Sequence, residues 1–559
     1  MKEKKPLLQL EDLSISSKEG LLINGLSFTV NSNEIVAIVG ESGSGKSLTA
    51  LSIAGLLFQT PLSVSSQKME LSGQELSLLS HKDWQTVRGK DLGMVFQEPQ
   101  SSLNPSMRCG PQVMERLRQN QIVKPQEYRN RVLEAFEQVQ LPQPKRIFRA
   151  YPHELSGGQK QRVMIAMALI GSPKLLIADE PTTALDVTVQ KEILTLIKDR
   201  QKAHKMSVLF ISHDLSVVAQ FADRVLVMHQ GILVESGTVA EIFKNPQDPY
   251  TQALLYARPQ PDERLKRLPT VADFSQKQKS FKSISKATRA KKHQVLYTQK
   301  PLLEVQGLVK EYPLTRHWFK ENQSLKAVNE VSFDLYPGET LGLVGESGCG
   351  KSTISRALVN LDPPTGGDIR YKGRSTIGLN PKELRDLRKQ IQLVFQDPFA
   401  ALHPLKYIGD AIAEPLHVHG LVNGKDAQKQ RVFRLLEQVG LGAEHYHRYP
   451  HQLSGGQRQR VVIARALATE PQLLLMDESV AALDISVQAQ VLNLLNDLKE
   501  QLQLSYLFIS HDLNVVKYMA DRILVMQKGI LVEEGEADEL YFHPQQPYTR
   551  ELIAALPRI

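Results

Sequence analysis

The feature that most constrains the fold is an internal repeat of nearly 300 residues. GESGSGKS at residues 40–47 returns as GESGCGKS at 345–352, and YPHELSGGQKQRV at 151–163 returns as YPHQLSGGQRQRV at 449–461. From this second segment to a PYT tripeptide near the end of each copy, the offset is a constant 298 residues. A repeat of this length corresponds to a whole domain, so the sequence predicts two similar domains in one polypeptide.

The two predicted domains span residues 1–258 and 301–559, and residues 259–300 connect them. At 559 residues the chain is too long for a single core, which agrees with this division. Between the glycine-rich octapeptide and a later FQ dipeptide, the first copy is six residues longer than the second. Pro, Ser and polar residues near positions 61–90 predict that the extra residues form a loop insertion.

The connecting segment begins RPQPDERLKRLPT and continues as a stretch rich in Ser, Lys and Gln, without apolar periodicity. This composition predicts a flexible, extended tether. Residues 261–300 contain eleven Lys and Arg against three Asp and Glu, which accounts for the whole chain's net charge of +8. No nucleic-acid-binding face is therefore expected on the two domains. A solvated tether is the main interpretation, and a basic strip that contacts anionic lipid or RNA is the alternative.

Cysteine content and hydropathy exclude several classes of protein. The two cysteines, Cys109 and Cys349, lie far apart, which excludes a disulfide framework and a thiolate metal cluster and fits a reducing cytoplasm. The N-terminal residues lack the apolar core of a secretory signal. The best uncharged run, residues 47–67, is broken by Gln59 and Pro61 and is too polar to span a bilayer. We therefore expect the chain to serve any membrane from outside the bilayer.

Each copy contains a glycine-rich loop between an apolar run and a helical pattern. The runs EIVAIVG and TLGLVG precede the loops, which is the strand–loop–helix context of a phosphate-binding loop, or P-loop. Glycines let backbone N–H groups converge on phosphate oxygens, and the helix N-terminus favours negative charge. The lysine of each loop should reach the β- and γ-phosphates, and the following serine should ligate Mg²⁺. The predicted nucleotide-binding positions are Gly40, Ser42, Gly43, Gly45, Lys46, Ser47 and Leu48, and Gly345, Ser347, Gly348, Gly350, Lys351, Ser352 and Thr353.

A second pair of motifs ends in adjacent acids. KLLIADE and QLLLMDE are buried-strand patterns that end in Asp179–Glu180 and Asp477–Glu478. The aspartates are expected to position Mg²⁺, and the glutamates to orient the attacking water or accept its proton. An acid pair after a strand is usually a surface turn. Its place about 130 residues after a P-loop favours the catalytic interpretation here.

The LSGGQ pentapeptide occurs at residues 155–159 and 453–457, each time before an amphipathic helical pattern. Ser-Gly-Gly at a helix start exposes backbone amides and a hydroxyl group, which is an anion-binding arrangement. A plain N-cap with a flexible entry is the alternative interpretation of each pentapeptide by itself.

The order P-loop, FQ(E/D)P, LSGGQ, strand–DE, ALD, SHD resembles that of the ABC ATPases, and the resemblance covers nearly the whole chain except the connecting segment. It implies an α/β fold of two tandem P-loop NTPase domains. Each domain would have a RecA-like core, an antiparallel β subdomain and an α-helical subdomain. The helical subdomains are expected at residues 98–150 and 397–448 and would pass motion to a membrane permease.

In that family, the LSGGQ of one copy closes over the nucleotide held by the other copy. The resemblance therefore implies two composite ATP sites and dimerisation of the two halves within the chain. The first site would combine Lys46, Ser47, Gln97, Asp179, Glu180 and His213 with Ser454 and Gly456. The second would combine Lys351, Ser352, Gln396, Asp477, Glu478 and His511 with Ser156 and Gly158.

The resemblance also assigns roles to individual residues within each site. The histidines would contact the γ-phosphate, and the glutamines would sense it. The implied Mg²⁺ ligands are Ser47, Gln97 and Asp179, and Ser352, Gln396 and Asp477. Tyr312 lies where the family stacks an aromatic ring on adenine, whereas the first copy has Ser16 and Ser17 there, so its grip on adenine is expected to be weaker.

The tails EIFKNPQDPYTQALL and ELYFHPQQPYTRELI resemble the dipeptide/oligopeptide/nickel branch of bacterial uptake transporters. That branch implies two permease subunits, an extracytoplasmic solute-binding protein and a place at the cytoplasmic face of the bacterial plasma membrane. Peptides are the leading substrate class, with nickel chelates, glutathione and opine-like compounds as alternatives. A two-copy ABC protein that acts on ribosomes is an alternative of a different class. Residues 256–300 contain no cysteine, so no iron–sulfur cluster is expected there.

Overall fold

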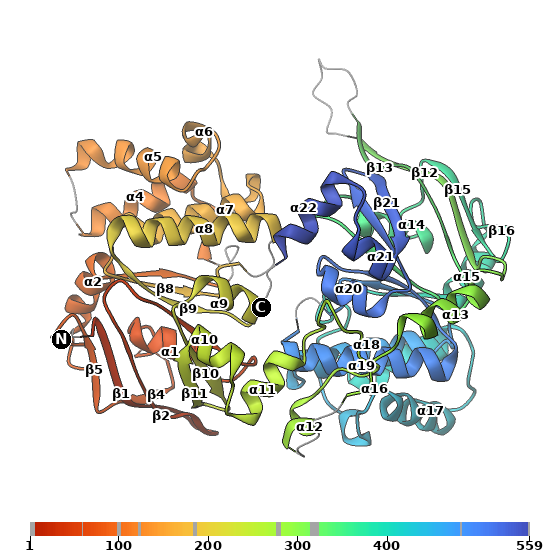
Figure 1. The fold of residues 1–559 in the computed structure, drawn as a ribbon, viewed down its shortest axis with the longest axis horizontal. Helices are drawn as coiled ribbons and strands as arrows, with labels where there is room; N and C mark the ends of the chain where they lie inside the picture. The colour runs from red at the N-terminus through yellow and green to blue at the C-terminus, as the bar shows by residue number, and fades with distance from the viewer. Residues whose placement is uncertain are drawn as a thin grey trace. The chain divides into compact units, whose positions relative to one another are not determined.

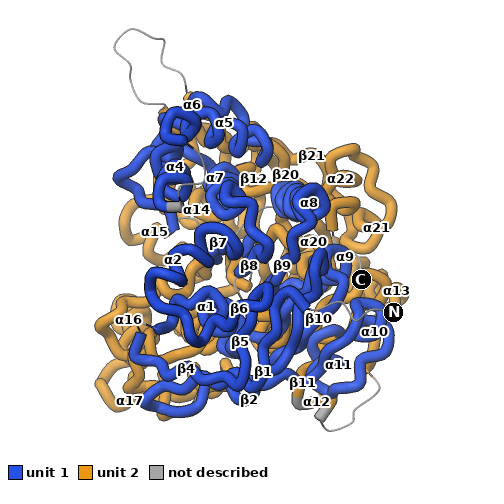
Figure 2. Tube along the Cα trace, turned by 90° about the vertical axis from the view of Figure 1, so that its left-hand side faces the viewer, with its two compact units in different colours: residues 1–255, 557–559 blue, residues 256–556 orange. Residues whose placement is uncertain are grey.

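The computed structural model describes residues 6–58, 60–97, 102–120, 124–182, 187–275, 281–313, 324–480 and 483–556. The chain divides into two compact units, one that ends at Leu255 and one that covers Tyr256–Leu556 (Figure 2). Each unit contains one copy of the repeat. Within the described ranges, no helix is long and apolar enough to cross a membrane.

The central sheet of the first unit has the strand order β11-β10-β3-β9-β8-β7. Strands β7 to β10 and β3 are parallel to their neighbours, and β11 pairs antiparallel with β10. Every residue of β3, β8 and β9 is buried, as expected for parallel strands that are covered on both faces. The bounds are β3 Ile35–Val39, β7 Leu92–Val95, β8 Leu175–Asp179, β9 Ser207–Ile211, β10 Arg224–His229 and β11 Ile232–Thr238.

A second, antiparallel sheet of this unit has the order β2-β1-β5-β6, with β4 beside β1. Strand β4 lies in the predicted loop insertion and pairs with residues 14–16 of β1, so the insertion is not a plain loop. Its central Val64 is half-buried between two exposed serines, an alternation typical of a strand. The bounds are β1 Leu8–Ser17, β2 Gly20–Val30, β4 Ser63–Ser65, β5 Lys68–Leu71 and β6 Gln74–Glu75.

The helices of the first unit fall into two groups. Helices α4, α5 and α6 gather away from the central sheet, where the α-helical subdomain was expected (Figure 1). The others border the sheets. The bounds are α1 Lys46–Ile53, α2 His81–Lys90, α4 Cys109–Asn120, η1 Pro125–Glu127, α5 Tyr128–Gln138, α6 Pro144–Arg149, η2 Pro152–Glu154, α7 Gly157–Leu169, α8 Val187–His204, α9 Leu215–Phe221, α10 Val239–Lys244 and α11 Pro249–Tyr256.

The second unit repeats this architecture, which confirms the predicted fold class. Its central sheet has the order β17-β18-β19-β14-β20-β21, and its antiparallel sheet the order β13-β12-β15-β16. The bounds are β12 Leu303–Pro313, β13 Ser324–Leu335, β14 Thr340–Val344, β15 Gly366–Tyr371, β16 Arg374–Ser375, β17 Ile391–Val394, β18 Leu473–Asp477, β19 Ser505–Ile509, β20 Arg522–Gln527 and β21 Ile530–Glu536.

The helices of the second unit follow the same order along the chain as those of the first. Helices α16 and α17 occupy the predicted helical subdomain at residues 397–448. The bounds are α14 Lys351–Leu358, α15 Pro381–Gln390, α16 Ile408–Val418, α17 Lys425–Gln438, η3 Ala443–His445, η4 Pro450–Gln452, α18 Gly455–Leu467, α19 Ile485–Leu502, α20 Leu513–Met519, α21 Ala537–Phe542 and α22 Pro547–Ala555.

The segment between the copies differs from the expected extended tether. Its described part contains α12 (Val271–Ser275), α13 (Lys286–Leu296) and a β-bridge between Leu265 and Ser283. The whole segment after Leu255 belongs to the second unit. Local periodicity could not indicate this order, because the stabilising contacts are made with residues more than 200 positions later in the chain.

Candidate functional site

Each P-loop lies between a buried parallel strand and a helix, as the sequence predicts. Strands β3 and β14 lead into the loops, and α1 and α14 begin at Lys46 and Lys351. Gly40 has a φ of 151°, and an added Cβ would lie 2.1 Å from the carbonyl oxygen of Met228. Only glycine fits at this close approach, which fixes the loop at the carboxyl edge of the sheet.

The P-loop lysines are buried and folded back over their own loops. Lys46 Nζ donates hydrogen bonds to the carbonyl oxygens of Gly40 at 2.8 Å and Glu41 at 2.7 Å. The second copy repeats both contacts through Lys351, each at 2.8 Å. The ammonium group therefore lies at the centre of the loop, where a nucleotide phosphate would sit.

Two of the three predicted metal ligands of each copy, the serine and the aspartate, lie in direct contact, whereas the glutamine bonds to the neighbouring glutamate. Ser47 Oγ donates to Asp179 Oδ1 at 3.1 Å, and Ser352 Oγ donates to Asp477 Oδ1 at 3.0 Å. Each aspartate ends a buried parallel strand beside the P-loop, and its side chain is itself buried. A hydroxyl group next to a carboxylate is an oxygen donor set that Mg²⁺ accepts, so these residues fit the metal.

The two aspartates differ in the number of hydroxyl groups that stabilise them. Burial raises the pKa of Asp179 to about 6, against the opposing hydrogen bond from Ser47. Burial also raises the pKa of Asp477, but here Ser355 Oγ donates a further hydrogen bond, at 3.1 Å. The first copy has Ala50 at the position of Ser355. The carboxylate of the second site is therefore the better stabilised of the two.

We predict that Mg²⁺-dependent hydrolysis at the first site falls as the pH drops through about 6. The pKa of Asp179 is raised, so a proton occupies the metal-binding carboxylate below that pH and competes with Mg²⁺. The Ala50→Ser variant supplies the missing hydroxyl group and should move the loss to lower pH. Mg²⁺ titrations of ATP hydrolysis between about pH 5 and about pH 8 test this, and an identical profile for the variant would contradict it.

The candidate catalytic glutamates have an unusual backbone conformation. Glu180 and Glu478 have φ values of 45° and 47°, in the left-handed region, which costs roughly 1–3 kcal/mol for a residue that is not glycine. In both copies the backbone N–H donates to the end of the neighbouring strand, to Ile211 or Ile509, at 2.9 Å. The conformation thus recurs at the same position of both copies.

The glutamine of each copy contacts the glutamate of the same copy. Gln97 Nε2 donates to Glu180 Oε2 at 3.0 Å, and Gln396 Nε2 donates to Glu478 Oε2 at 2.8 Å. The residues are 83 and 82 positions apart in sequence, and adjacent parallel strands bring them together. The structure thus places these two predicted residues of each site within hydrogen-bonding distance.

The histidines complete each cluster. His213 Nδ1 lies 3.1 Å from Glu180 Oε2, and His511 Nδ1 lies 3.6 Å from Glu478 Oε2. The hydrogen bond from His511 lowers the pKa of Glu478, although burial opposes it. Burial works against a charge on His511, but the contact with Glu478 outweighs it and raises the pKa of the histidine. The second cluster therefore favours an ionised glutamate beside a protonated histidine.

The LSGGQ residues lie at helix starts, as predicted. Ser156 and Ser454 are the N-caps of α7 and α18, and each Oγ accepts from a backbone N–H at 3.3 Å. Gly456 packs against α19, where an added Cβ would lie 2.2 Å from Val487 Cγ1. An added Cβ at Gly158 would lie 2.8 Å from Val189. The pairing of each LSGGQ with the P-loop of the other copy stays a prediction.

The adenine-stacking position also stays a prediction. The Tyr312 hydroxyl donates to Asp362, which follows α14, and Lys310 Nζ lies 5.2 Å from the centre of its ring. Burial, with the contact to Asp362, raises the pKa of this tyrosine. At the same place in the first unit, Ser16 pairs with Ser63 of the inserted strand β4, so the two copies differ here in backbone as well as side chain.

Sequence analysis missed a contact between the tail tyrosines and the P-loops. The buried Tyr250 hydroxyl accepts a hydrogen bond from the backbone N–H of Glu41 at 3.0 Å. The buried Tyr548 hydroxyl accepts one from Glu346 N–H at 3.2 Å. The recurrence of PYT at the same offset in both tails was the available signal. Each tyrosine thus holds the peptide whose carbonyl binds the P-loop lysine.

We predict that Tyr250→Phe and Tyr548→Phe each weaken ATP binding at their own P-loop by about 2- to 10-fold, the value of one buried hydrogen bond. The matched control is Tyr256→Phe, since this tyrosine ends the same helix but is 53% exposed. Equilibrium binding of a fluorescent ATP analogue measures the effect. Equal affinities for Tyr250→Phe and the control would contradict the prediction.

Two protein-family models match the chain, each of them in both copies. A protein-family model described as ABC transporter matches residues 23–183 and 328–481. A model described as the oligopeptide/dipeptide transporter C-terminal region matches residues 234–283 and 532–559. A solved structure, the dimeric post-hydrolysis state of the ATP-binding cassette MJ0796 bound to ADP and Pi, covers 42% of this chain and 98% of its own chain, at 30% identity and a TM-score of 0.38.

Curated relatives match almost the entire chain. The glutathione import ATP-binding proteins GsiA of Shigella sonnei (strain Ss046) and Escherichia coli (strain K12) are each 47% identical over 566 residues, which cover 99% of this chain and 89% of the relative. The chain therefore belongs to the ABC transporter family, as an ATP-binding protein with two ATPase cassettes that each carry the oligopeptide/dipeptide transporter C-terminal region.

Proposed function

We propose that this protein is the ATP-hydrolysing subunit that powers uptake of peptides or similar small solutes through a separate membrane permease. The oligopeptide/dipeptide C-terminal region in both copies is the observation that carries the proposal. Glutathione, which is a tripeptide, is the favoured substrate, because the relatives with 47% identity are glutathione import ATP-binding proteins. Nickel chelates and opine-like compounds are the remaining candidates.

Each site contains the groups that ATP hydrolysis requires. Lys46 would bind the nucleotide phosphates, and Glu180, which contacts Gln97 and His213, would orient water and accept its proton. Bound Mg²⁺ would neutralise charge on the β- and γ-phosphates. Ser47 and Asp179, and the matching residues of the second copy, would hold it. We propose that Ser454 and Gly456 complete the first site, and Ser156 and Gly158 the second.

The proposed partners are two permease subunits and, through them, an extracytoplasmic solute-binding protein. The chain would bind the permease peripherally at the cytoplasmic face of the bacterial plasma membrane. ATP at both composite sites would draw the cassettes together, and hydrolysis would release them. This is coupling in the strict sense, because two distinct sites bias one open–closed equilibrium.

Uptake in a strain that lacks the gene tests the proposal. We expect the deletion to abolish uptake of labelled glutathione or of dipeptides, and the intact gene to restore it. A gene that carries both Glu180→Gln and Glu478→Gln should not restore it. Unchanged uptake of every candidate solute after deletion, or co-sedimentation of the protein with ribosomes instead of with a permease, would overturn the proposal in favour of the ribosomal alternative.

A further inference from the structure

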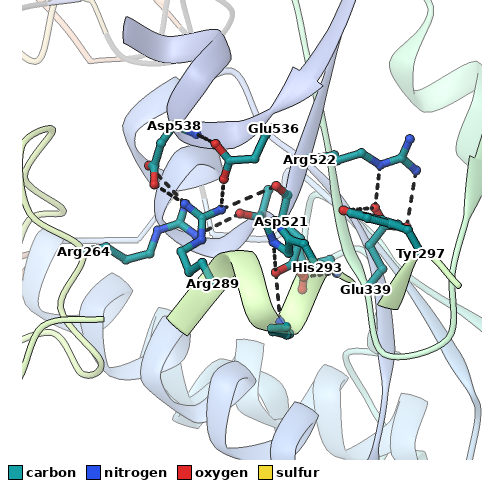
Figure 3. A network of polar contacts seen from close by, with 12 residues as sticks. Arg264, Arg289, His293, Tyr297, Glu339, Asp521, Arg522, Glu536 and Asp538 are labelled. Carbon is teal, nitrogen blue, oxygen red and sulfur yellow. Dashed lines mark hydrogen bonds and ion pairs between the residues drawn. The ribbon is translucent and has the colours of Figure 1, made fainter. Parts of the chain in front are cut away.

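The segment between the cassettes is attached to the second unit by a buried ion network (Figure 3). Arg289 of α13 is only 6% exposed and pairs with Asp538 and with Glu536, the latter at 2.5 Å. Arg264, which precedes α13, also pairs with Asp538 and donates to the backbone carbonyl of Ala520 at 3.1 Å. Two cations of the segment, Arg264 and Arg289, thus bind carboxylates inside the second unit.

The same network reaches the strand that carries the second P-loop. Asp521 accepts from Lys292 at 2.9 Å and from His293 at 3.3 Å, both on α13 (Figure 3). Its other oxygen accepts from the backbone N–H of Thr340, the first residue of β14, at 2.9 Å. Burial alone would raise the pKa of Asp521, but Lys499, His293 and Lys292 hold it well below its usual range. The carboxylate is therefore a charged link between α13 and β14.

Two of the acidic side chains that bind this segment occur only in the second copy. Asp223 of the first copy accepts from Ile35 N–H at 2.8 Å, just as Asp521 does from Thr340. The positions of Glu536 and Asp538, however, are Thr238 and Ala240 in the first copy. The acidic pair that binds Arg289 is therefore specific to the second cassette.

At its start, the segment contacts the loop that carries the catalytic histidine. Arg258 pairs with Asp512 Oδ2 at 3.7 Å, and both side chains are largely buried. Asp512 directly follows His511 in the chain. Its other oxygen caps α20 by accepting from Asn514 N–H at 2.9 Å and Val515 N–H at 3.3 Å. Arg258 thus binds the residue next to His511, and His511 contacts the candidate catalytic Glu478.

We propose that Arg258, at the start of this segment, is a positioning residue of the second ATP site that fixes the position of His511 through Asp512. The buried pairs of Arg289 and Lys292 hold the segment in place, and Arg258 restrains the histidine loop. The proposal rests on the proposed role of His511 in hydrolysis. It makes the two sites of the chain unequal, because Glu536 and Asp538, which bind Arg289 of this segment, have no acidic counterparts in the first copy.

The first test measures the position of His511 without using ATP hydrolysis. Diethylpyrocarbonate modifies exposed histidines, and mass spectrometry gives the rate for each one in the full-length protein. The Arg258→Gln variant is expected to change the rate at His511 by at least about twofold, through looser restraint of its loop, and to leave His213 unchanged. The matched control is Arg267→Gln, since Arg267 pairs with Asp497 on the surface, where the side chains are 66% and 47% exposed.

The second test measures the consequence for hydrolysis. Arg258→Gln is expected to lower kcat about 3- to 10-fold with little change in KM for ATP, because it misplaces a catalytic group without touching the nucleotide. Arg258→Lys should restore part of the loss. In the His511→Ala variant, Arg258→Gln should cause no further loss of kcat. In the His213→Ala variant, it should cause the same fold loss of kcat as in the unaltered protein.

Different results separate the positioning proposal from the proposed function. Unchanged labelling of His511 in Arg258→Gln overturns the positioning role. So does an equal further loss of kcat when Arg258→Gln is added to His511→Ala and when it is added to His213→Ala. Either result holds even if hydrolysis depends on both histidines. Normal hydrolysis by His511→Ala overturns the catalytic role of His511 and the positioning role together.

Discussion

Replacing Glu180 and Glu478 together by glutamine is expected to lower ATP hydrolysis by about 100-fold or more while ATP binding persists. Each glutamate is at the carboxyl end of a strand, in a strained conformation, in contact with a glutamine and a histidine. An amide has nearly the same shape as the carboxylate but cannot accept a proton from water. The loss should therefore appear in kcat and not in affinity.

Steady-state phosphate release and equilibrium ATP binding on the same preparation measure the two effects. Glu263→Gln is a suitable control, because this glutamate lies in the connecting segment and outside both clusters. Hydrolysis within about threefold of the unaltered protein would exclude these residues as the general bases of the reaction.

Replacing Lys46 and Lys351 by methionine is expected to have the largest effect on affinity. Each ammonium group is buried and bound to two carbonyl oxygens of its P-loop, so it is already placed for the phosphates. Charged hydrogen bonds of this kind contribute about 1.5–3 kcal/mol, which predicts a loss of about 10- to 100-fold in ATP affinity. Methionine keeps most of the length of the unbranched side chain and removes the charge and the donors.

Single variants should reveal whether the two P-loops are equivalent. Lys351 Nζ also lies 3.8 Å from Glu478 Oε1, so Lys351→Met removes a partner of the catalytic carboxylate as well. Titration with a fluorescent ATP analogue should resolve two binding steps in the unaltered protein and lose one in each single variant. ATP affinity that is unchanged in the double variant would contradict the assignment of these loops.

Much of the fold and both candidate catalytic clusters could be predicted from the sequence, because their motifs are local and occur twice. A glycine-rich turn after a buried strand has few possible geometries, and Asp179 and Glu180 follow such a strand directly. The ends of adjacent parallel strands meet at one edge of a sheet, so Gln97 and His213 join them there.

Other features depend on pairs of residues that no local pattern relates. The contact of Tyr250 with Glu41 spans 209 positions, and that of Arg289 with Asp538 spans 249. The ordered structure of the connecting segment could not be predicted. Its polar composition would be the same whether its cations were solvated or paired with buried carboxylates. The same applies to the serine that supports Asp477, whose counterpart is Ala50, because its role appears only when helix and strand are packed together.

The central claim is that the two cassettes share their ATP sites, so that each P-loop is completed by the LSGGQ of the other copy. The thiol of Cys349 in the second P-loop offers a direct test, once the other cysteine is removed by Cys109→Ala. A new thiol is introduced by Ser156→Cys or, in a matched variant, by Ser454→Cys. The Glu180→Gln and Glu478→Gln substitutions keep ATP bound while a short thiol-specific cross-linker is added.

Mass spectrometry of the cross-linked peptides then shows which LSGGQ faces the second P-loop. Shared sites predict an ATP-dependent cross-link within one chain between Cys349 and position 156, and none between Cys349 and position 454. A cross-link to position 454, or no cross-link to position 156 in the presence of ATP, would contradict shared sites.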